Sequence, residues 1–234
     1  MAYAASDGNL SAIKVLLKYG AQDDNALVKA AEGGHSNIVH HLLHHKMSCD
    51  GALVRACQEG HEDVVTVMLE ANESPDTPYK GKTPRQAATV YPNILRMLIQ
   101  FGAKSNTGDG ALYLACWSGH EDAVEILLTA GENPNTPYDS ETPAEAATAG
   151  GFYKILELLC KHGAEIKPEQ LIQACKEGNA KMVMALLEGG EDPDTPHNDE
   201  TPRQAAATNG HPSILHLLLK HGAKCNTSPP PGRP

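Results

Sequence analysis

Apolar residues recur along the chain in short clusters with the spacing i, i+1, i+4 and i+5. Ile38-Val39-His40-His41-Leu42-Leu43 is one example, with polar residues between its two apolar pairs. This spacing places the apolar side chains on one face of a helix with 3.6 residues per turn. Eight such segments are predicted to form amphipathic helices, at residues 12–17, 38–43, 64–69, 94–99, 124–128, 155–159, 183–187 and 214–218.

A second kind of segment, centred on small residues, comes before seven of these helices. A turn that often contains glycine separates the two segments, so each unit is expected to hold two antiparallel helices. Small side chains allow neighbouring helices to approach to the short end of the usual spacing of about 8–10 Å. The small pairs are Ala30-Ala31, Ala56-Cys57, Ala87-Ala88, Ala115-Cys116, Ala146-Ala147, Ala174-Cys175 and Ala205-Ala206.

The chain also repeats itself with an offset of 59 residues. Cys57, Cys116 and Cys175 are 59 apart, and residues 111–169 match residues 170–228 at 26 of 59 positions. A fixed repeat of this length indicates a row of small units, each unable to bury its apolar face alone. The working part of such a protein is expected to be a surface and not a deep pocket.

Three of the first helices carry a strong start signal. Threonine is a good cap, proline suits the first helical position, and a Gln or Glu three residues after the cap can reach back to it. The sequence therefore predicts capping boxes at Thr83-Pro84-Arg85-Gln86, Thr142-Pro143-Ala144-Glu145 and Thr201-Pro202-Arg203-Gln204.

Together these motifs resemble the ankyrin repeat, in which Thr-Pro-Leu-His-x-Ala-Ala-x-x-Gly-His precedes an Ile-Val-x-x-Leu-Leu helix and Gly-Ala. Residues 201–211, then 214–218, then Gly222-Ala223 give the best match. The resemblance implies an all-α fold, an ankyrin-type α-solenoid of helix-turn-helix repeats with a few β-hairpin fingers. It implies one domain over residues 1–226, whereas the proline-rich composition of residues 227–234 predicts a disordered tail. The expected repeats are 1–24, 25–50, 51–82, 83–109, 110–141, 142–168, 169–200 and 201–226.

The chain departs from the family pattern in three ways. Arg or Ala replaces the Leu after Thr-Pro, and Gln or Glu replaces the His, so the cap is expected to hold the first helix. The repeat length alternates, and hairpin fingers are therefore expected only at residues 73–82, 132–141 and 191–200. Residues 89–93 are two residues shorter than the matching turn at 148–154, so this turn should be tight and irregular.

The charge and composition narrow the choice of partner. The formal net charge is -10, which argues against nucleic acid as the main ligand. Residues 118–234 hold 17 acidic and 9 basic side chains, so this half is expected to prefer a basic partner. The recurring cysteines suit packing as small hydrophobes, and there is no Cys-x-x-Cys motif. Without a signal segment or an apolar run of membrane length, the chain is expected in the cytoplasm, with the nucleus as an alternative and no membrane partner.

The resemblance implies that a partner protein binds the concave face, built from finger tips and exposed ends of the first helices. Trp117 is the only tryptophan in a chain with 4% aromatic residues, and it falls on this face. An aromatic anchor of this kind dominates many interfaces, although Trp117 also suits simple cover of a neighbouring unit. The full expected contact set is Tyr79, Tyr91, Tyr113, Trp117, Tyr138, Lys176, His197, Asp199 and Glu200.

The histidines suggest chemistry but are expected to be structural or solvent-facing. His40, His41, His44 and His45 make two i,i+4 pairs of the kind that chelates zinc, yet no cysteine or carboxylate near them in sequence completes a set, and a polar helix face is preferred. The Gly-His histidines, His35, His61, His120 and His211, are expected to hydrogen-bond locally. No metal, cofactor or small-molecule substrate is expected.

No catalytic motif stands out, and the chain is not expected to be an enzyme. The His-Glu-x-x-His pattern fails because Val65 and Val124 occupy the place of the second histidine. The function expected is a protein-interaction scaffold. The alternative is the substrate-recognition arm of a larger protein, such as a ubiquitin-ligase adaptor or bacterial effector, which the uncapped first and last helices favour. A metal-responsive binder is a third reading.

Overall fold

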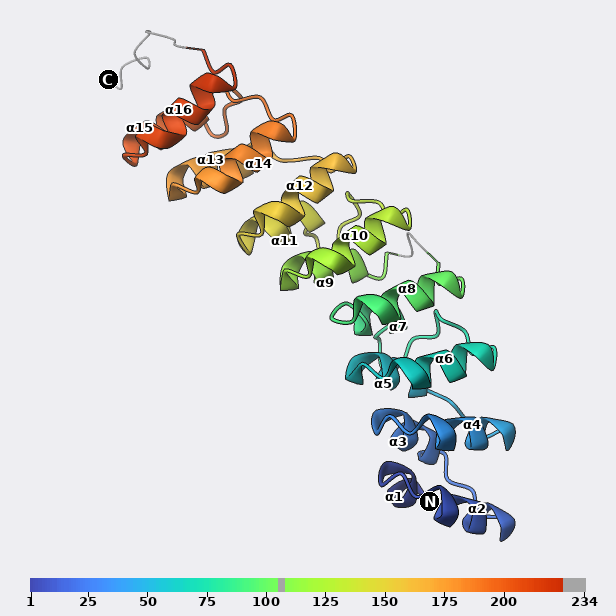
Figure 1. The fold of residues 1–234 in the computed structure, drawn as a ribbon. Coiled ribbons are helices and arrows are strands. Elements are labelled where there is room, and N and C mark those ends of the chain that lie inside the picture. Colours follow the sequence, from blue (N-terminus) through green and yellow to red (C-terminus); the bar gives the residue numbers. More distant parts are fainter. Residues whose placement is uncertain (105–107, 225–234) are drawn as a thin grey trace. The chain divides into compact units, whose positions relative to one another are not determined.

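The computed structural model describes residues 1–104 and 108–224, and within them it contains sixteen helices in consecutive pairs (Figure 1). The helices are α1 (Ala2–Ser6), α2 (Leu10–Lys18), α3 (Ala26–Glu32), α4 (Ser36–His44), α5 (Ala52–Glu59), α6 (Glu62–Glu70), α7 (Pro84–Ala87), α8 (Pro92–Gln100), α9 (Ala111–Ser118), α10 (Glu121–Thr129), α11 (Pro143–Ala149), α12 (Tyr153–Lys161), α13 (Pro168–Glu177), α14 (Ala180–Glu188), α15 (Pro202–Thr208) and α16 (Pro212–Lys220). The predicted helical fold is confirmed. The predicted tail at 227–234 lies outside the described residues.

The chain forms two compact units. The first unit is residues 1–115 and 122–133, and the second is residues 116–121 and 134–234. In the first unit, α1, α3, α5 and α7 pack side by side as one layer, and α2, α4, α6 and α8 form the layer behind it (Figure 1). The second unit has the same order, because α13 packs on α15, and α12, α14 and α16 follow one another.

The core of each unit follows the predicted pattern. In the first unit, Ile38, Val39 and Leu42 of α4 are buried, while His40 is exposed. The small residues of the first helices are buried as well, among them Ala30, Ala31, Ala56 and Cys57. Each helix pair therefore buries its apolar face against the neighbouring pairs of its unit, which is how short helices become stable.

All three predicted capping boxes are present. In α11, the Glu145 backbone N–H donates to Thr142 Oγ1 at 3.2 Å, and the Thr142 N–H donates to Glu145 Oε2 at 2.7 Å. These two bonds satisfy donors that a helix start otherwise leaves unpaired. Thr83 with Gln86 and Thr201 with Gln204 repeat the arrangement.

An aromatic or imidazole ring closes the turn between the two helices of a pair. His35 Nε2 lies 2.9 Å from the backbone oxygen of Ser6, and His61 Nε2 lies 2.9 Å from that of Glu32. His211 Nε2 bonds the oxygen of Lys176 in the same manner, at 3.0 Å. The prediction that these histidines bond locally was therefore wrong, because each ring reaches the end of the preceding first helix.

The turn at residues 89–93 is irregular, as predicted. Helix α7 is only four residues long, and no residue of this turn has positive φ, whereas Gly60 and Gly119 in the matching turns have φ of 78° and 76°. Tyr91 takes the place of the turn histidine: it is the N-cap of α8, and its ring lies directly against Gly60.

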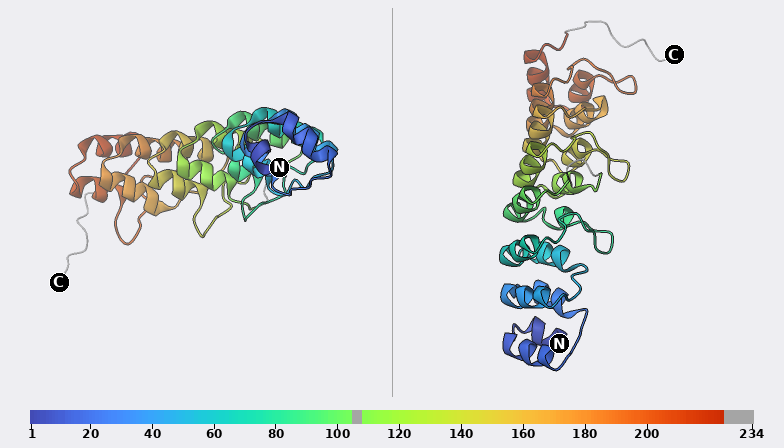
Figure 2. Two further views of the ribbon diagram at one scale, coloured as in Figure 1. Left: turned by 90° about the horizontal axis from the view of Figure 1, so that it is seen from below. Right: turned by 90° about the vertical axis from the view of Figure 1, so that its right-hand side faces the viewer.

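The three predicted fingers are present as two-residue hairpins, each with a single bridge. They are closed by Tyr79 and Lys82, Tyr138 and Glu141, and His197 and Glu200, and they project beyond the helices (Figure 2). Both central residues of each turn have positive φ, which is the backbone of a type I′ turn. Type I′ turns match the twist of paired strands, so each tip is well defined.

A side chain at the base of each finger holds it to the loop that follows the next helix pair. Asp76 accepts from the Lys104 N–H at 3.0 Å, and Asp194 accepts from the Lys224 N–H at 3.0 Å. Asn135 accepts from the Glu165 N–H at 2.7 Å and donates to the Gly163 oxygen at 3.0 Å. Hydrogen bonds between these side chains and backbone groups therefore anchor the fingers at their bases.

The cysteines behave as the small hydrophobes predicted from their spacing. Cys57, Cys116 and Cys175 are buried free thiols. Burial raises the pKa of Cys57 and of Cys175 to about 12, so both stay protonated at neutral pH. Among the described residues, no helix combines the length and apolarity needed to cross a membrane.

Candidate partner-binding surface

In each unit the candidate surface consists of the exposed C-terminal ends of its first helices and of its fingers, and we call it the finger face of that unit. Trp117 lies near the end of α9 with 56% of its surface exposed. Lys176 is exposed at the end of α13, and Val90 is exposed just beyond α7. The first helices therefore present one aromatic, one cationic and one aliphatic side chain from three different pairs.

The finger at residues 73–82 presents its lysine more freely than its tyrosine. The Tyr79 ring lies directly against Gly51 at the start of α5, and an added Cβ there would overlap the ring. Lys80 Nζ lies 5.2 Å from the centre of the same ring, a cation–π distance. Tyr79 is half-buried, and its ring holds the finger against the start of α5.

The finger at residues 191–200 is linked to α13 by one ion pair and by a contact of a histidine with a carboxylate. Lys176 Nζ lies 2.8 Å from Glu200 Oε2, and His197 Nε2 lies 3.8 Å from Glu169 Oε2. The structure therefore brings Lys176, His197 and Glu200 together, although sequence reasoning selected them separately. Asp199 stays exposed at the tip with φ of 62°.

The remaining predicted residues have mixed environments. Tyr113 is half-buried on α9, and Tyr138 is half-buried at the closing pair of its finger. Tyr91 is half-buried with its ring against Gly60. Its position is that of the turn histidines and not that of an exposed helix end.

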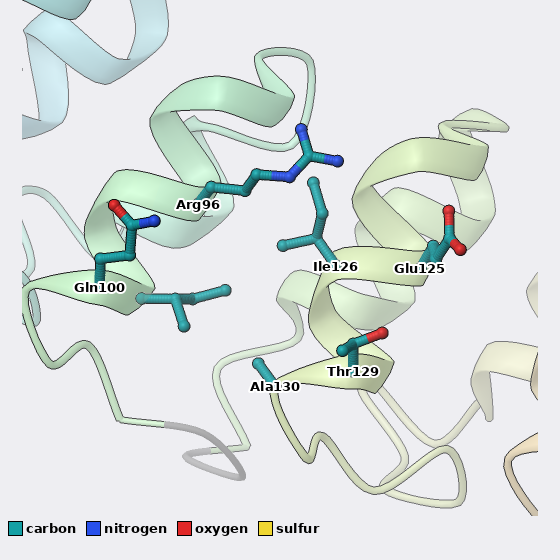
Figure 3. A pocket seen from close by; sticks show the side chains of 7 residues that line it. Arg96, Gln100, Glu125, Ile126, Thr129 and Ala130 are labelled. Atoms are coloured by element: carbon teal, nitrogen blue, oxygen red, sulfur yellow. The ribbon is translucent and has the colours of Figure 1, made fainter.

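A groove on the second helices lies outside the predicted surface (Figure 3). It has a volume of about 450 Å³ and lies between α8 and α10 of the first unit. Ile99 and Ile126 supply its apolar part, while Arg96 and Glu125 stand on the two helices (Figure 3). The same positions in the α4–α6 and α12–α14 pairs also line cavities. All three pairs are at the finger-free connections of the chain.

Sequence reasoning missed a buried charge cluster centred on Arg85. This side chain is 1% exposed, and it pairs with Asp109 at 3.0 Å and with Glu132. Thr83 Oγ1 also donates to Asp109 Oδ2 at 2.9 Å. The helix start at α7 is thus held by its cap and by Arg85 together, whereas the cap was expected to contribute more than the residues that replace Leu and His. The signal available in the sequence was Arg85 itself, because the ankyrin pattern has Leu at this position.

Within residues 1–104 and 108–224, no group of three or more His, Cys, Asp or Glu side chains is arranged to hold an ion. The finger face instead combines an exposed aromatic ring, fixed turns and charged tips, which suits contact with another macromolecule.

Paired antiparallel helices, small-residue first helices and alternate hairpin fingers define a helical repeat protein. The family described as ankyrin repeats (3 copies) matches residues 1–79, 53–138, 86–170 and 145–228. The chain belongs to the ankyrin repeat family. Proteins of this family are generally protein-interaction modules.

Several curated proteins are similar over about half of the chain. Ankyrin repeat and KH domain-containing protein mask-1 of Caenorhabditis elegans is 31% identical over 130 residues, covering 48% of this chain and 5% of that protein. Mouse oxysterol-binding protein-related protein 1 is 30% identical over 158 residues, covering 52% and 17%. Mouse ankyrin repeat and SOCS box protein 16 is 28% identical over 189 residues, covering 58% and 42%. The chain therefore spans less than half the length of each of these relatives.

A solved structure supports the fold. The ankyrin repeat domain of human ASB11 superposes with a TM-score of 0.66 and 21% identity, covering 86% of this chain and 99% of that one. At this identity the likeness shows the ankyrin solenoid fold.

Proposed function

We propose that this chain is a scaffold that binds a partner protein through its finger face. The observation that carries the proposal is Trp117, a large aromatic side chain left 56% exposed on α9 in a chain with few aromatic residues. A tryptophan in this position supplies much contact area at little entropic cost, and such residues dominate measured interface energies. The chain itself is proposed to have no catalytic role.

The proposed partner carries a basic segment. The second unit presents exposed acidic residues at two finger tips, Asp139 and Asp199, and another, Glu177, at the end of α13. Lys176 lies among them but is paired with Glu200. Opposite charge would speed the encounter and fix the orientation of the partner, and salt would weaken the effect.

Selection from a random peptide library displayed on phage tests the proposed partner chemistry. Sequences rich in Lys and Arg should be enriched, and their binding to the purified chain should weaken when salt rises from about 0.05 to 0.5 M. Enrichment of acidic peptides, or of apolar peptides whose binding ignores salt, would contradict a basic partner. Neither result depends on knowing the natural partner.

The second candidate function is a substrate-recognition arm within a larger protein, of the ubiquitin-ligase adaptor or bacterial effector type. It is supported by the likeness to the ankyrin repeat and SOCS box protein, whose name joins the repeats to a second module. The complete reading frame around the gene separates the two candidates. An adjoining catalytic or adaptor domain would favour the arm, and its absence would favour the scaffold.

A further inference from the structure

Helix α4 presents four histidines as two i,i+4 pairs. His40 and His44 are both exposed, and their ring centres are 6.5 Å apart. His41 and His45 form the other pair, at 4.9 Å. Two histidines four residues apart lie on one helix face, which is the spacing that lets them bind a single zinc ion.

The two pairs face different surroundings. His40 and His44 line a cavity of about 290 Å³ together with Glu70, which stands on the neighbouring helix α6. His41 is half-buried; burial first, and then the charges of His45 and Lys14, lower its pKa. A carboxylate near the first pair favours a bound cation, while the lysine near the second pair repels one.

The corresponding cavities at α8 and α12 are not lined by paired histidines. The fifth and ninth residues of α8 are Arg96 and Gln100, and those of α12 are Glu157 and Lys161, which pair with each other at 2.6 Å. Guanidinium and ammonium groups do not ligate metal ions. The repeat architecture therefore supplies the groove at all three places, and only the one at α4 contains paired imidazoles.

From this arrangement we infer that His40 and His44 form a two-histidine site for a divalent transition-metal ion such as Zn²⁺. Imidazole nitrogen suits such ions, which bind it at about 2.0–2.1 Å. Both rings are exposed, so they turn toward one ion without breaking packing contacts. Water fills the remaining coordination positions, consistent with the absence of a three-residue ligand group among the described residues.

Glu70 acts in this site as a positioning residue. Glu70 lines the same cavity, and in the proposed site its carboxylate accepts a hydrogen bond from metal-bound water and offsets the charge of the ion. Outer partners of this kind contribute about 10- to 100-fold to metal affinity in known sites. The ion would bridge α4 and α6 within the first unit.

Isothermal titration of the untagged chain with ZnCl₂ at pH 7.5 tests the site. One ion per chain is expected, with a dissociation constant in the micromolar range. Substitution His44→Asn should abolish this binding, and Glu70→Gln should weaken it about tenfold. The matched control His45→Asn removes a histidine from the other pair and should leave the affinity unchanged.

A second measurement separates loss of binding from loss of folding. Melting of each variant by circular dichroism should be unchanged without zinc, since the three substituted side chains are exposed. No heat with Zn²⁺ near 100 µM chain, binding that survives His44→Asn, or loss with His45→Asn instead would overturn the site.

Discussion

Arg85 Nη2 lies 3.0 Å from Asp109 Oδ1, and both side chains are largely removed from solvent. Asp109 also accepts from Thr83 Oγ1 and from the Ala111 N–H, so it joins the start of α7 to the start of α9. Glu132, which follows the C-terminal end of α10, is the second carboxylate that pairs with Arg85. The attraction of the two carboxylates outweighs burial and raises the pKa of Arg85, which therefore stays charged.

Arg85→Ala is expected to destabilise the first unit by about 3 kcal/mol or more, because it leaves two buried carboxylates without a cation. Urea unfolding, followed by circular dichroism, measures the change. The matched control is Arg203→Ala, the same position at the start of α15, where the side chain is more exposed and bonds the Lys224 oxygen. Its expected cost is below about 1 kcal/mol. Equal costs at the two positions would contradict a special role for the buried cluster.

Ser140→Gly is expected to stabilise its finger by about 1 kcal/mol. Ser140 has φ of 74°, a left-handed conformation that costs a residue with a Cβ and costs glycine little. Gly81 occupies the same turn position of the first finger with φ of 77°, and an added Cβ would have open space there. Gly81→Ser should therefore change stability by a similar amount in the opposite direction. Thermal melting of both variants is the measurement, and shifts of the same sign would refute the turn assignment.

Gly119→Ala should destabilise the second unit more than Gly151→Ala. The two glycines have similar φ, 76° and 72°, so the backbone strain of alanine is matched. Only at Gly119 would the new Cβ meet a ring, 2.6 Å from Phe152 Cε1. Overpacking of this type adds about 1–3 kcal/mol.

The Phe152→Ala background separates strain from ring contact in this comparison. In that background the difference between Gly119→Ala and Gly151→Ala should shrink toward zero, measured again by urea unfolding. A difference in stability that persists without the ring would show that contact with the Phe152 ring is not its cause.

Glu145→Gln is expected to remove a pH-dependent part of the stability of α11. Burial alone raises the pKa of Glu145, but the Lys167 ion pair and the Thr142 hydrogen bonds outweigh it, and the pKa lies below its ordinary value of 4.5. A lowered folded-state pKa means that the stabilisation is present above pH 4.5 and is lost as the pH falls through the folded-state pKa. The free energy of unfolding of the wild type should exceed that of the variant by about 1 kcal/mol at pH 7, and the difference should shrink toward zero as the pH falls through the folded-state pKa of Glu145.

The other capping boxes supply the control for this titration. They already carry glutamine, at Gln86 and Gln204, and their hydrogen bonds match those of Glu145. Reversing the exchange with Gln204→Glu should therefore add a stability term that fades in acid. A Glu145→Gln variant whose deficit stays constant from pH 7 to pH 3 would contradict the linkage.

Features specified by nearby residues could be predicted from sequence, and features specified across the fold could not. Thr142 and Glu145 are three residues apart, so their capping box was visible in the sequence. The bond from His61 to Glu32 spans 29 residues, and the prediction of a local bond therefore failed. Arg85 finds Glu132 47 residues further along the chain, a pairing that periodicity does not show.

The candidate surface, too, could be predicted from the sequence only in part. The resemblance to the ankyrin repeat placed Trp117 at an exposed helix end, and the structure agrees. It did not reveal that Lys176 pairs with Glu200 or that the Tyr91 ring covers Gly60, because both contacts join residues that are far apart in the sequence. Whether the nine predicted residues contact a partner stays a prediction.

Partner capture from a cell extract, compared between Trp117→Ala and Met184→Ala, tests the proposed finger face most directly. Met184 is an exposed apolar residue on the second helix α14, 39% exposed, and so it controls for the loss of apolar surface alone. The amount of each captured protein and the melting temperature of each variant are measured together. We predict that Trp117→Ala loses partners that wild type and Met184→Ala retain, with melting unchanged. Undiminished capture by Trp117→Ala, equal loss in both variants, or loss accompanied by an equal fall in melting temperature would contradict the account.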